Sequence, residues 1–296
     1  MDRIGFVRAG LMGQGMAACL IEAGHEVTVI AHRNRAPIDA LVAKGATEAP
    51  DIAALARAAD VLHICAPGSP QVEAVVEAAL PHLPEGAVIL DCSTSNPIST
   101  ERLAALASGR GVGWADAPLG GTPVQAAEGK LSAMVGAEAE VLERLRPVIG
   151  AWAETVVHVG GPAMGHRMKL LNNFVSLGYG AIYAEALALA ERTGLGAETF
   201  DRVIRGSRMD CGFYRTFMGH TIDGDPNSHR FTLTNALKDL TYLGAMAEGA
   251  GIDDPVGAAA RGSFARAVEM GGDGPQDYVP HLVDWVARAN GTGGAG

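Results

Sequence analysis

The sequence predicts an α/β domain with a parallel sheet, followed by an all-helical domain that a long helix joins to the first. Three observations lead to this prediction. Short β-branched runs alternate with helical stretches over residues 4–160. The strand signal stops after residues 160–162, where Gly-Gly-Pro interrupts the pattern. The length of 296 residues suits two domains of about 150 residues each.

The first domain is predicted from apolar runs that are typical of buried strands. These runs are Ile4–Val7, Glu26–Ile30, Val61–Cys65, Ala87–Asp91, Leu131–Val135 and Thr155–Val159, with Gly113–Asp116 as a candidate for one more. Ala- and Leu-rich stretches of helical period separate most of them, among them Met12–Ala23, Ile52–Ala59 and Pro70–Leu80. Strands that alternate with helices form a parallel sheet covered on both faces.

The second domain is predicted to be helical throughout. From Met164 to Thr193 the chain has neither a strand signal nor a proline, so we expect one helix there, ending at Gly194 as its C-cap. Later turns fall at Gly206, residues 223–226 and residues 253–255. The predicted domains are residues 1–162 and 163–290, with 291–296 as a disordered tail.

The composition limits the function classes. Hydrophobic residues make up 48% and charged residues 19%, which excludes a disordered or fibrous chain. A net charge of −10 gives no bulk attraction for nucleic acid or an anionic membrane. No apolar run is long enough to span a membrane, and the apolar run at Ile4 leaves no room for a signal peptide before it.

The cysteines and histidines form no recognisable metal motif. Cys19, Cys65, Cys92 and Cys211 are far apart without a C-x-x-C pair, so we expect reduced, buried thiols and a cytoplasmic location. No two histidines are spaced as ligands on one helix, and no metal site is predicted.

A glycine loop between the first strand and the first helix predicts a nucleotide site. It reads Val7-Arg-Ala-Gly10-Leu11-Met12-Gly13, and a strand, loop and helix in this order offer backbone N–H groups and a helix dipole to a pyrophosphate. Arg8 stands where the G-x-G-x-x-G fingerprint has its first glycine. The first domain is thus predicted to be a Rossmann-type dinucleotide-binding domain, with a plain strand-to-helix turn as the alternative.

The end of the second strand bears on the choice of cofactor. A carboxylate there would bind a ribose 2′-hydroxyl and indicate NAD, but residues 30–35 contain none. They contain Arg33 and Arg35, whose guanidinium groups suit a 2′-phosphate and favour NADP. The alternative is that both arginines are only solvated.

A polar cluster opens the long helix. Lys169, Asn172 and Asn173 are spaced by three and four residues, which places both amides on the same face as the lysine. The lysine can exchange a proton with an alkoxide, and the amides can orient a hydroxyl or carbonyl. A polar helix end without function is the alternative.

Six motifs in this order resemble those of the β-hydroxyacid dehydrogenases, the group of 3-hydroxyisobutyrate dehydrogenase and of the glyoxylate and tartronate semialdehyde reductases, which are related to 6-phosphogluconate dehydrogenase. The motifs are Gly10-Leu-Met-Gly13, Asp91-Cys-Ser93-Thr94, Asp116-Ala-Pro118-Leu-Gly120-Gly121, Gly129-Lys-Leu-x-x-Met134-Val-Gly136, Lys169-Leu-Leu-Asn172-Asn173 and Lys238-Asp239-Leu.

The resemblance implies a role for each motif. Lys169 matches the catalytic lysine of the family, and Asn173 and Asn172 match its substrate-binding amides. The resemblance also implies that Ser93 and Thr94 lie on a loop beside the nicotinamide. The loop with Gly120, Gly121 and Thr122 would bind the substrate carboxylate, and Lys238 would reach toward the cofactor. The family also implies a homodimer or homotetramer built through the helical domain.

The predicted function is reversible hydride transfer between NADP(H) and a small β-hydroxy acid or its semialdehyde. Two departures from the family pattern bear on it. Arg8 replaces the first loop glycine, which leaves a nucleotide-binding protein of the same fold with impaired or lost turnover as the alternative. Gly120 stands where many members have serine, and Gly121 stands where the sulfolactaldehyde-reducing branch has its sulfonate-binding arginine. We therefore expect a carboxylate rather than a sulfonate substrate.

Overall fold

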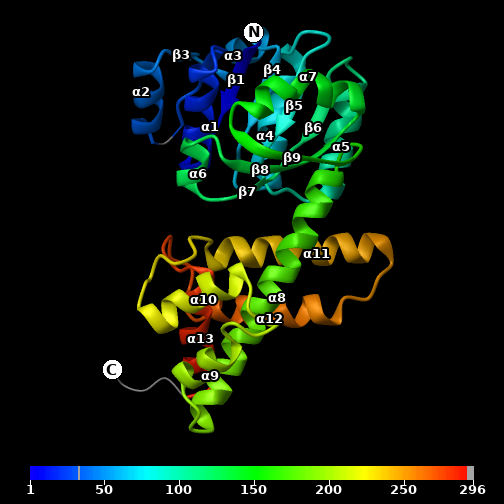
Figure 1. The fold of residues 1–296 in the computed structure, drawn as a ribbon. Helices are drawn as coiled ribbons and strands as arrows, with labels where there is room; N and C mark the ends of the chain where they lie inside the picture. Colours follow the sequence, from blue (N-terminus) through cyan, green and yellow to red (C-terminus); the bar gives the residue numbers. More distant parts are fainter. Residues whose placement is uncertain (33, 292–296) are drawn as a thin grey trace. The chain divides into compact units, whose positions relative to one another are not determined.

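The computed structural model describes residues 1–32 and 34–291 (Figure 1). Arg33 and most of the predicted tail, residues 292–296, lie outside the described residues. The chain forms two compact units, residues 1–169 and residues 170–296. The helix that follows the sheet, α8 (Met164–Arg192), begins in the first unit and continues into the second.

The first unit is built on one nine-stranded sheet, counted over the described residues. Its strands are β1 (Arg3–Val7), β2 (Glu26–Val29), β3 (Thr47–Glu48), β4 (Val61–Ile64), β5 (Val88–Asp91), β6 (Gly113–Asp116), β7 (Leu119–Gly120), β8 (Leu131–Ala137) and β9 (Ala153–Gly160). They are ordered β3-β2-β1-β4-β5-β6-β8-β7, and β9 pairs with β8. The strand order reverses beside β1, which makes the carboxyl ends of β1 and β4 a place where α/β proteins bind ligands.

Helices cover both faces of this sheet (Figure 1). They are α1 (Leu11–Glu22), α2 (Ala36–Ala43), α3 (Ile52–Ala58), α4 (Ser69–Ala79), the 3-10 turn η1 (Leu80–His82), α5 (Pro97–Ser108), α6 (Pro123–Ala127) and α7 (Ala139–Gly150). Successive residues of β4 point to opposite faces. Val61 packs in a core with Met16 of α1, whereas Leu62 packs in a second core with Leu55 and Val76. The buried runs of β-branched residues therefore fit a sheet that is covered on both sides.

The predicted α/β class is confirmed, but one feature of the sheet differs from the expectation. Strands β1 to β6 are parallel, whereas β8 runs antiparallel to β6 and to β7, and β9 is parallel to β8. Side chains alternate in the same way in either strand direction, so the sequence pattern does not reveal a reversal. The two-residue strands β3 and β7 are too short to show any period.

The second unit is helical, as predicted. After α8 it contains α9 (Ala197–Ile204), α10 (Gly212–Asp223), α11 (Leu233–Ala250), α12 (Pro255–Glu269), the 3-10 turn η2 (Val279–His281) and α13 (Leu282–Ala289). Large side chains such as Tyr214, Phe217 and Phe264 fill its core and are fully buried. Gly224 and Gly251 end α10 and α11 with positive φ angles of 65° and 66°, a backbone conformation that glycine adopts without strain.

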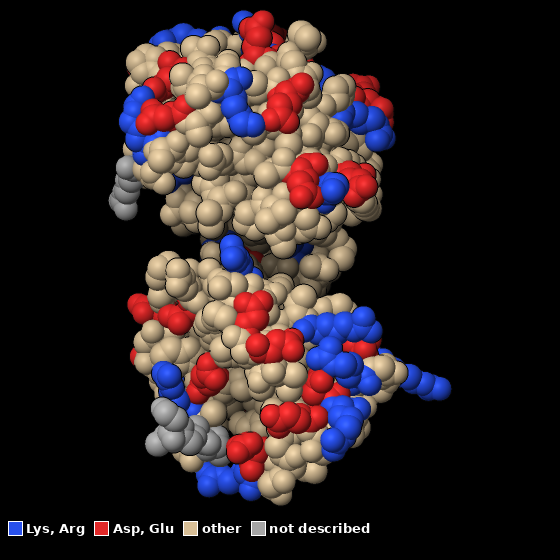
Figure 2. All heavy atoms as spheres, turned by 60° about the vertical axis from the view of Figure 1, so that its left-hand side comes forward, with Lys and Arg blue, Asp and Glu red and all other residues tan. Residues whose placement is uncertain are grey.

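The surface carries charges of both signs. On the face drawn in Figure 2, acidic and basic side chains are intermixed, in keeping with the modest excess of acidic residues in the sequence. Over the part of the chain that the structure describes, no helix is long and apolar enough to cross a membrane. All four cysteines are free thiols, with Cys19 and Cys92 buried and Cys65 and Cys211 only half-buried.

Candidate active site

The glycine loop joins the carboxyl end of β1 to α1. Gly10 is the N-cap of α1, no side chain caps this helix end, and no acidic residue stands in its first turn. A Cβ atom on Gly10 would meet nothing within 4 Å, whereas one on Gly13 would lie 2.7 Å from the carbonyl oxygen of Arg8. Gly10 therefore leaves open space over the first turn, and Gly13 allows the helix to pack closely on the loop.

Arg8 holds a backbone conformation that favours glycine. Its φ angle is +74°, in the left-handed region that side chains with a Cβ atom rarely occupy. The Arg8 carbonyl accepts a hydrogen bond from the Gly10 N–H at 2.8 Å, which closes the turn. The loop thus keeps a glycine-type turn, at a cost of about 1–2 kcal/mol for an L-residue in this region.

Arg35 is bound within the chain at the start of α2. Its guanidinium donates to both carboxylate oxygens of Glu48, at 2.9 and 2.7 Å, and its Nε lies 3.1 Å from Asp39. The hydrogen bonds and charge of Glu48 raise the pKa of Arg35, and those of Arg35 lower the pKa of Glu48. Arg35 is thus not simply solvated, and a phosphate that used it would compete with Glu48.

Ser93 is buried in the loop that follows β5. Its hydroxyl accepts a hydrogen bond from the Ala66 N–H at 2.8 Å, and its own N–H donates to Asp91 at 2.9 Å. These bonds join the loops after β4 and β5 at the same edge of the sheet as the glycine loop. Only 3% of Ser93 is exposed, so its side chain serves mainly to shape these loops.

The loop from Gly120 to Thr122 is stabilised by hydrogen bonds to Ser132 and Gln125. Gly120 ends β7 and its carbonyl accepts from the Ser132 hydroxyl at 3.3 Å, while Gly121 has a φ of +129°. Thr122 caps α6: its hydroxyl accepts from the Gln125 N–H, and its N–H donates to the Gln125 side chain at 2.9 Å. A carboxylate bound by the Thr122 N–H would have to displace Gln125.

Lys169, Asn172 and Asn173 all stand on α8, which runs without a break through these positions. Lys169 is half-buried, Asn172 is exposed and Asn173 is 6% exposed. The amide nitrogen of Asn173 donates to Asp239 Oδ2 at 2.7 Å. This bond fixes the orientation of the amide, because only the nitrogen can donate to a carboxylate.

Asp239 links Asn173 to Lys238. The Lys238 ammonium lies 3.1 Å from Asp239 Oδ1 and 5.4 Å from the centre of the Tyr242 ring. The Asp239 side chain is 2% exposed and the Lys238 side chain 24% exposed, so this ion pair is largely buried. The sequence analysis assigned no role to Asp239; a carboxylate among the apolar residues of α11 was the available signal.

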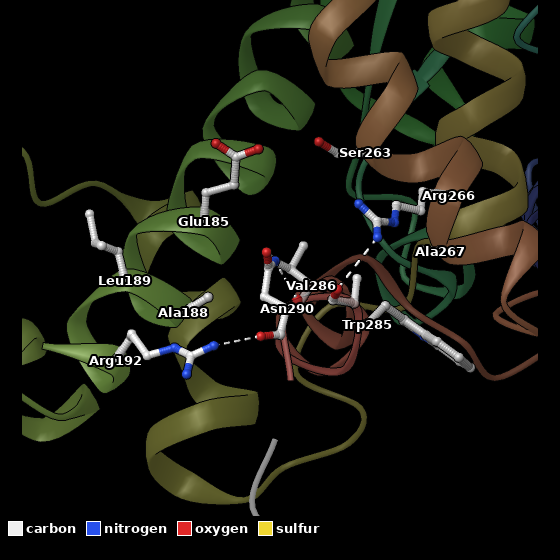
Figure 3. A pocket seen from close by; sticks show the side chains of 11 residues that line it. Glu185, Ala188, Leu189, Arg192, Ser263, Arg266, Ala267, Trp285, Val286 and Asn290 are labelled. Carbon is white, nitrogen blue, oxygen red and sulfur yellow. Dashed lines mark hydrogen bonds between the residues drawn. The ribbon is translucent and has the colours of Figure 1, made fainter. Parts of the chain in front are cut away.

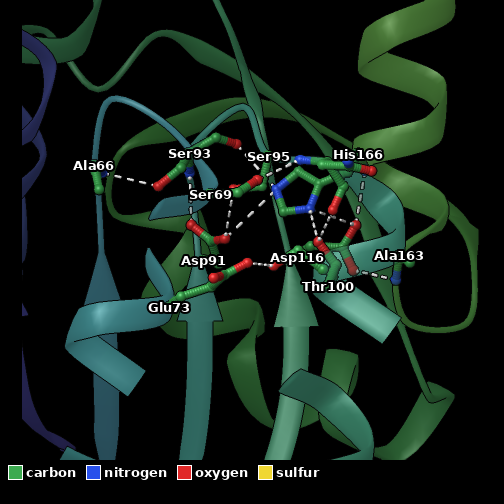
Figure 4. Close-up of polar contacts among 12 residues, drawn as sticks. Ala66, Ser69, Glu73, Asp91, Ser93, Ser95, Thr100, Asp116, Ala163 and His166 are labelled. Carbon is green, nitrogen blue, oxygen red and sulfur yellow. Dashed lines mark hydrogen bonds and ion pairs between the residues drawn. The ribbon is translucent and has the colours of Figure 1, made fainter. Parts of the chain in front are cut away.

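A second polar cluster, also missed by the sequence analysis, lies in the first unit. Asp91 and Asp116 end the neighbouring strands β5 and β6, and both lie beside His166 in the first turn of α8 (Figure 4). Asp116 accepts hydrogen bonds from the N–H groups of Ala163 and His166, at 2.6 and 2.8 Å. Burial raises the pKa of the Asp116 carboxyl, against the opposing effect of His166. A histidine one helical turn before Lys169 was the signal in the sequence.

A pocket in the second unit is lined by none of the predicted site residues. It has a volume of about 480 Å³ and is lined by residues of α8, α12 and α13, including Glu185, Arg192 and Arg266 (Figure 3). Arg192 and Arg266 donate to the carbonyl oxygens of Asn290 and Ala289, at 2.8 and 3.4 Å. Both arginines therefore satisfy carbonyl groups at the end of α13. The pocket begins twelve residues beyond Asn173 on α8, about 18 Å along the helix.

Within residues 1–32 and 34–291, no group of three or more His, Cys, Asp or Glu side chains is arranged to hold a metal ion.

Two family models together cover almost the whole chain. Residues 3–160 match the NAD binding domain of 6-phosphogluconate dehydrogenase. Residues 163–281 match the NAD-binding domain of NADP-dependent 3-hydroxyisobutyrate dehydrogenase.

Curated proteins and solved structures agree with these matches. The chain is 32% identical over 281 residues to 3-sulfolactaldehyde reductase of Escherichia coli, which covers 94% of each chain. It is 31% identical to the NAD-dependent L-serine dehydrogenase of Pseudomonas aeruginosa, over 92% of this chain and 94% of that protein. The structure of Mycobacterium tuberculosis 3-hydroxyisobutyrate dehydrogenase with L-serine superposes with a TM-score of 0.86, at 26% identity, over 96% of this chain and 98% of that one.

The left-handed backbone of Arg8 leads to a stability prediction. Arg8→Gly and Arg8→Ala both remove the guanidinium, but only glycine lacks the Cβ atom that strains this turn. We expect the free energy of unfolding of the Arg8→Gly variant, measured by urea denaturation, to be about 1 kcal/mol higher than that of the Arg8→Ala variant. Equal stability of the two variants would show that residue 8 does not hold a positive φ in solution.

Proposed function

The chain belongs to the β-hydroxyacid dehydrogenase family, and from that membership we propose reversible hydride transfer between NADP(H) and a small β-hydroxy acid or its semialdehyde, with Lys169 as the general acid and base. The chain is thus a nicotinamide-dependent hydroxyacid dehydrogenase; the choice of cofactor, the substrate and the role of each residue are the proposal. The observation that carries it is the α8 cluster of Lys169, Asn172 and Asn173, in which Asp239 orients the Asn173 amide.

The glycine loop fits a dinucleotide. The open space at Gly10 and the uncapped first turn of α1 would receive the pyrophosphate through the backbone of Gly10, Leu11, Met12 and Gly13. Ser93, Thr94 and Lys238 are proposed to contribute around the nicotinamide end. When bound, the nicotinamide supplies or accepts the hydride, and the protein supplies orientation and charge.

The substrate is proposed to be held by two segments. The Asn173 amide nitrogen donates to Asp239, and its carbonyl oxygen accepts from the Asn172 amide nitrogen at 3.5 Å. The same oxygen, which has a second lone pair, is proposed to accept from a substrate hydroxyl. The Gly120, Gly121 and Thr122 loop would take the carboxylate. In reduction Lys169 donates a proton to the substrate oxygen, and its charge stabilises the developing alkoxide; in oxidation it accepts the proton.

The alternative is a nucleotide-binding protein of the same fold with impaired or lost turnover. Its one support is Arg8, and that support is weakened because Arg8 holds a positive φ angle, which glycine adopts without strain, and because the turn is closed by a hydrogen bond to its carbonyl. Titration with NADPH and NADH, followed by turnover assays, separates the two functions: the alternative requires binding with impaired or no turnover of every β-hydroxy acid or semialdehyde tried.

Replacing the proposed proton donor should abolish most turnover. We expect Lys169→Ala to lower turnover by ~10²–10⁴-fold, the usual share of general acid–base catalysis, while cofactor binding persists. The assay would use a panel of L-serine, 3-hydroxyisobutyrate and small semialdehydes. Lys44→Ala, at an exposed lysine paired with Glu22, is the matched control and should retain wild-type turnover. Near-wild-type turnover of Lys169→Ala would remove this lysine from the mechanism.

The NADP preference can be tested at the Arg35 and Glu48 pair, together with Arg33, which is proposed to bind the same 2′-phosphate. Arg35→Ala should weaken NADPH binding about tenfold or more, as expected for a lost hydrogen bond to a charged group, with little effect on NADH. Glu48→Gln should tighten the binding of NADPH, because the phosphate no longer competes with a carboxylate for the Arg35 guanidinium. Arg146→Ala removes a comparable exposed arginine paired with Glu143 and serves as the control. An NADPH dissociation constant insensitive to Arg35→Ala would contradict the assignment.

We also propose that the chain forms a homodimer or homotetramer through α8. Within the second unit, Leu171, Val175, Ile182 and Leu189 are apolar and 46–65% exposed. Their spacing of four, seven and seven residues aligns them as one stripe, which can pack against the same stripe of a second copy around a twofold axis.

Acidic substitutions in this stripe should dissociate the proposed oligomer. Val175→Glu and Ile182→Glu are expected to lower the molar mass measured by light scattering, because they place carboxylates in an apolar interface. Leu106→Glu, at a comparably exposed leucine of α5, is the control and should leave the mass unchanged. A monomeric wild-type protein, or an unchanged mass in both stripe variants, would refute the proposal.

A further inference from the structure

Gly120 and Ser132 stand opposite each other where the short strand β7 pairs with β8. They are partners in the antiparallel register, next to the pair of Leu119 and Ala133. Side chains of directly opposed residues lie on the same face of an antiparallel pair. The Ser132 side chain therefore stands on the face to which a side chain at residue 120 would point.

The Ser132 hydroxyl takes the space that a side chain at residue 120 would need. A Cβ atom on Gly120 would lie 2.5 Å from Ser132 Oγ, well inside van der Waals contact. The same Cβ atom would lie 3.9 Å from Ser132 Cβ, which is an ordinary contact. It is thus the hydroxyl, and not the neighbouring strand, that fills this space. The hydroxyl at this place of the loop comes from β8.

Ser132 faces away from the core of the first unit. Its neighbours Leu131 and Ala133 are buried in that core, whereas Ser132 is half-buried. Gly120 is half-buried as well, and residues 121 and 122 are exposed. The hydroxyl therefore lies on the accessible side of the loop that is proposed to take the substrate carboxylate.

A long hydrogen bond holds the Ser132 hydroxyl. It donates to the Gly120 carbonyl oxygen at 3.3 Å, and the hydroxyl must be the donor because a carbonyl can only accept. Most O–H···O bonds are about 2.7–2.8 Å long, and those to a carboxylate are shorter and roughly twice as strong as neutral ones. A carboxylate within reach would therefore take this proton from the Gly120 carbonyl.

The other polar side chains of the loop are fixed in the cap of α6. The Thr122 hydroxyl accepts from the Gln125 N–H at 3.3 Å, and the Gln125 side chain accepts from the Thr122 N–H. These reciprocal bonds form a capping box. The bond of Ser132, which belongs to a different element, can be exchanged for a ligand without opening the end of a helix.

We propose that Ser132 is a substrate-binding residue, whose hydroxyl donates to the substrate carboxylate from the place that a side chain at residue 120 would fill. This inference rests on the proposed function, because it takes the Gly120–Thr122 loop as the carboxylate site. Its consequence is selectivity for acids: the hydroxyl contributes more to the binding of a charged carboxylate than to that of the corresponding neutral amide.

Binding of an unreactive acid tests the contact without turnover. Isobutyrate and isobutyramide are titrated by calorimetry into protein saturated with NADP or NAD, whichever binds more tightly. Ser132→Ala should weaken isobutyrate binding about tenfold or more, as for a lost hydrogen bond to a charged group, and isobutyramide binding by clearly less. Ser132→Thr keeps a hydroxyl on a strand residue and should retain most of the affinity.

A matched control removes a comparable hydroxyl elsewhere. Thr216, exposed on α10, donates to the Gly212 carbonyl oxygen at the same distance of 3.3 Å, so Thr216→Ala should leave isobutyrate binding unchanged. A wild-type protein that does not bind isobutyrate, or equal affinities of the wild-type protein and Ser132→Ala, would overturn the proposal.

A double-mutant cycle tests the space shared by residues 120 and 132. Gly120→Ala should displace the Ser132 hydroxyl and weaken isobutyrate binding by a factor similar to that of Ser132→Ala. Combined with Ser132→Ala it should add little, because the hydroxyl is already absent. Gly120→Ser combined with Ser132→Ala returns a hydroxyl to the same place and should recover affinity. Additive losses, or no recovery with serine, would contradict the proposed contact.

Failure of the proposed function would look different. It would appear as a wild-type protein without turnover, or as Lys169→Ala with wild-type turnover, and neither result alters the isobutyrate affinities. Where turnover is present, Ser132→Ala should raise KM for the acid about tenfold or more while kcat changes little, because the contact is made equally in the ground state and the transition state.

Discussion

Two buried carboxylates at the carboxyl ends of β5 and β6 constrain the loops at this edge of the sheet and the start of α8. Asp91 and Asp116 have no contact with solvent, so each must find donors within the chain. Asp91 finds them in the loop that follows its own strand, and Asp116 finds them in the first turn of α8. His166 lies between the two and adds its ring. The sheet edge, the Ser93 loop and the start of α8 are therefore held as one piece.

One helix then carries most of the proposed chemistry. α8 is anchored by Asp116 at its first turn, presents Lys169 one turn after His166, and bears Asn173 a further turn along. In the second unit Asp239 holds the Asn173 amide and pairs with Lys238. Buried side chains thus determine the orientation of the polar groups proposed to meet the substrate, which is the arrangement that pre-organised catalysis requires.

Several proposed ligand groups are already paired within the chain. Arg35 binds Glu48 and Asp39, and the Thr122 N–H binds Gln125. The exposed ion pairs of Arg35 contribute little stability, typically about 0–1 kcal/mol, so exchange of Glu48 or Asp39 for a ligand phosphate costs little. Arg8 differs from these groups because its backbone holds a positive φ angle, and its carbonyl oxygen would lie 2.7 Å from a Cβ atom on Gly13.

The sequence by itself determined the α/β class, most strands, the long helix, the nucleotide loop and the family. Each of these is encoded locally, in the period of apolar residues or in short motifs such as Lys169-Leu-Leu-Asn172-Asn173. Only the tertiary structure decided that β8 runs antiparallel, that Arg35 is paired with Glu48, and that Asp239 and His166 hold site residues in place. These facts depend on contacts between residues far apart in the chain, such as Ser93 and His166. A pattern read along one sequence contains the residue types but not their pairing in space.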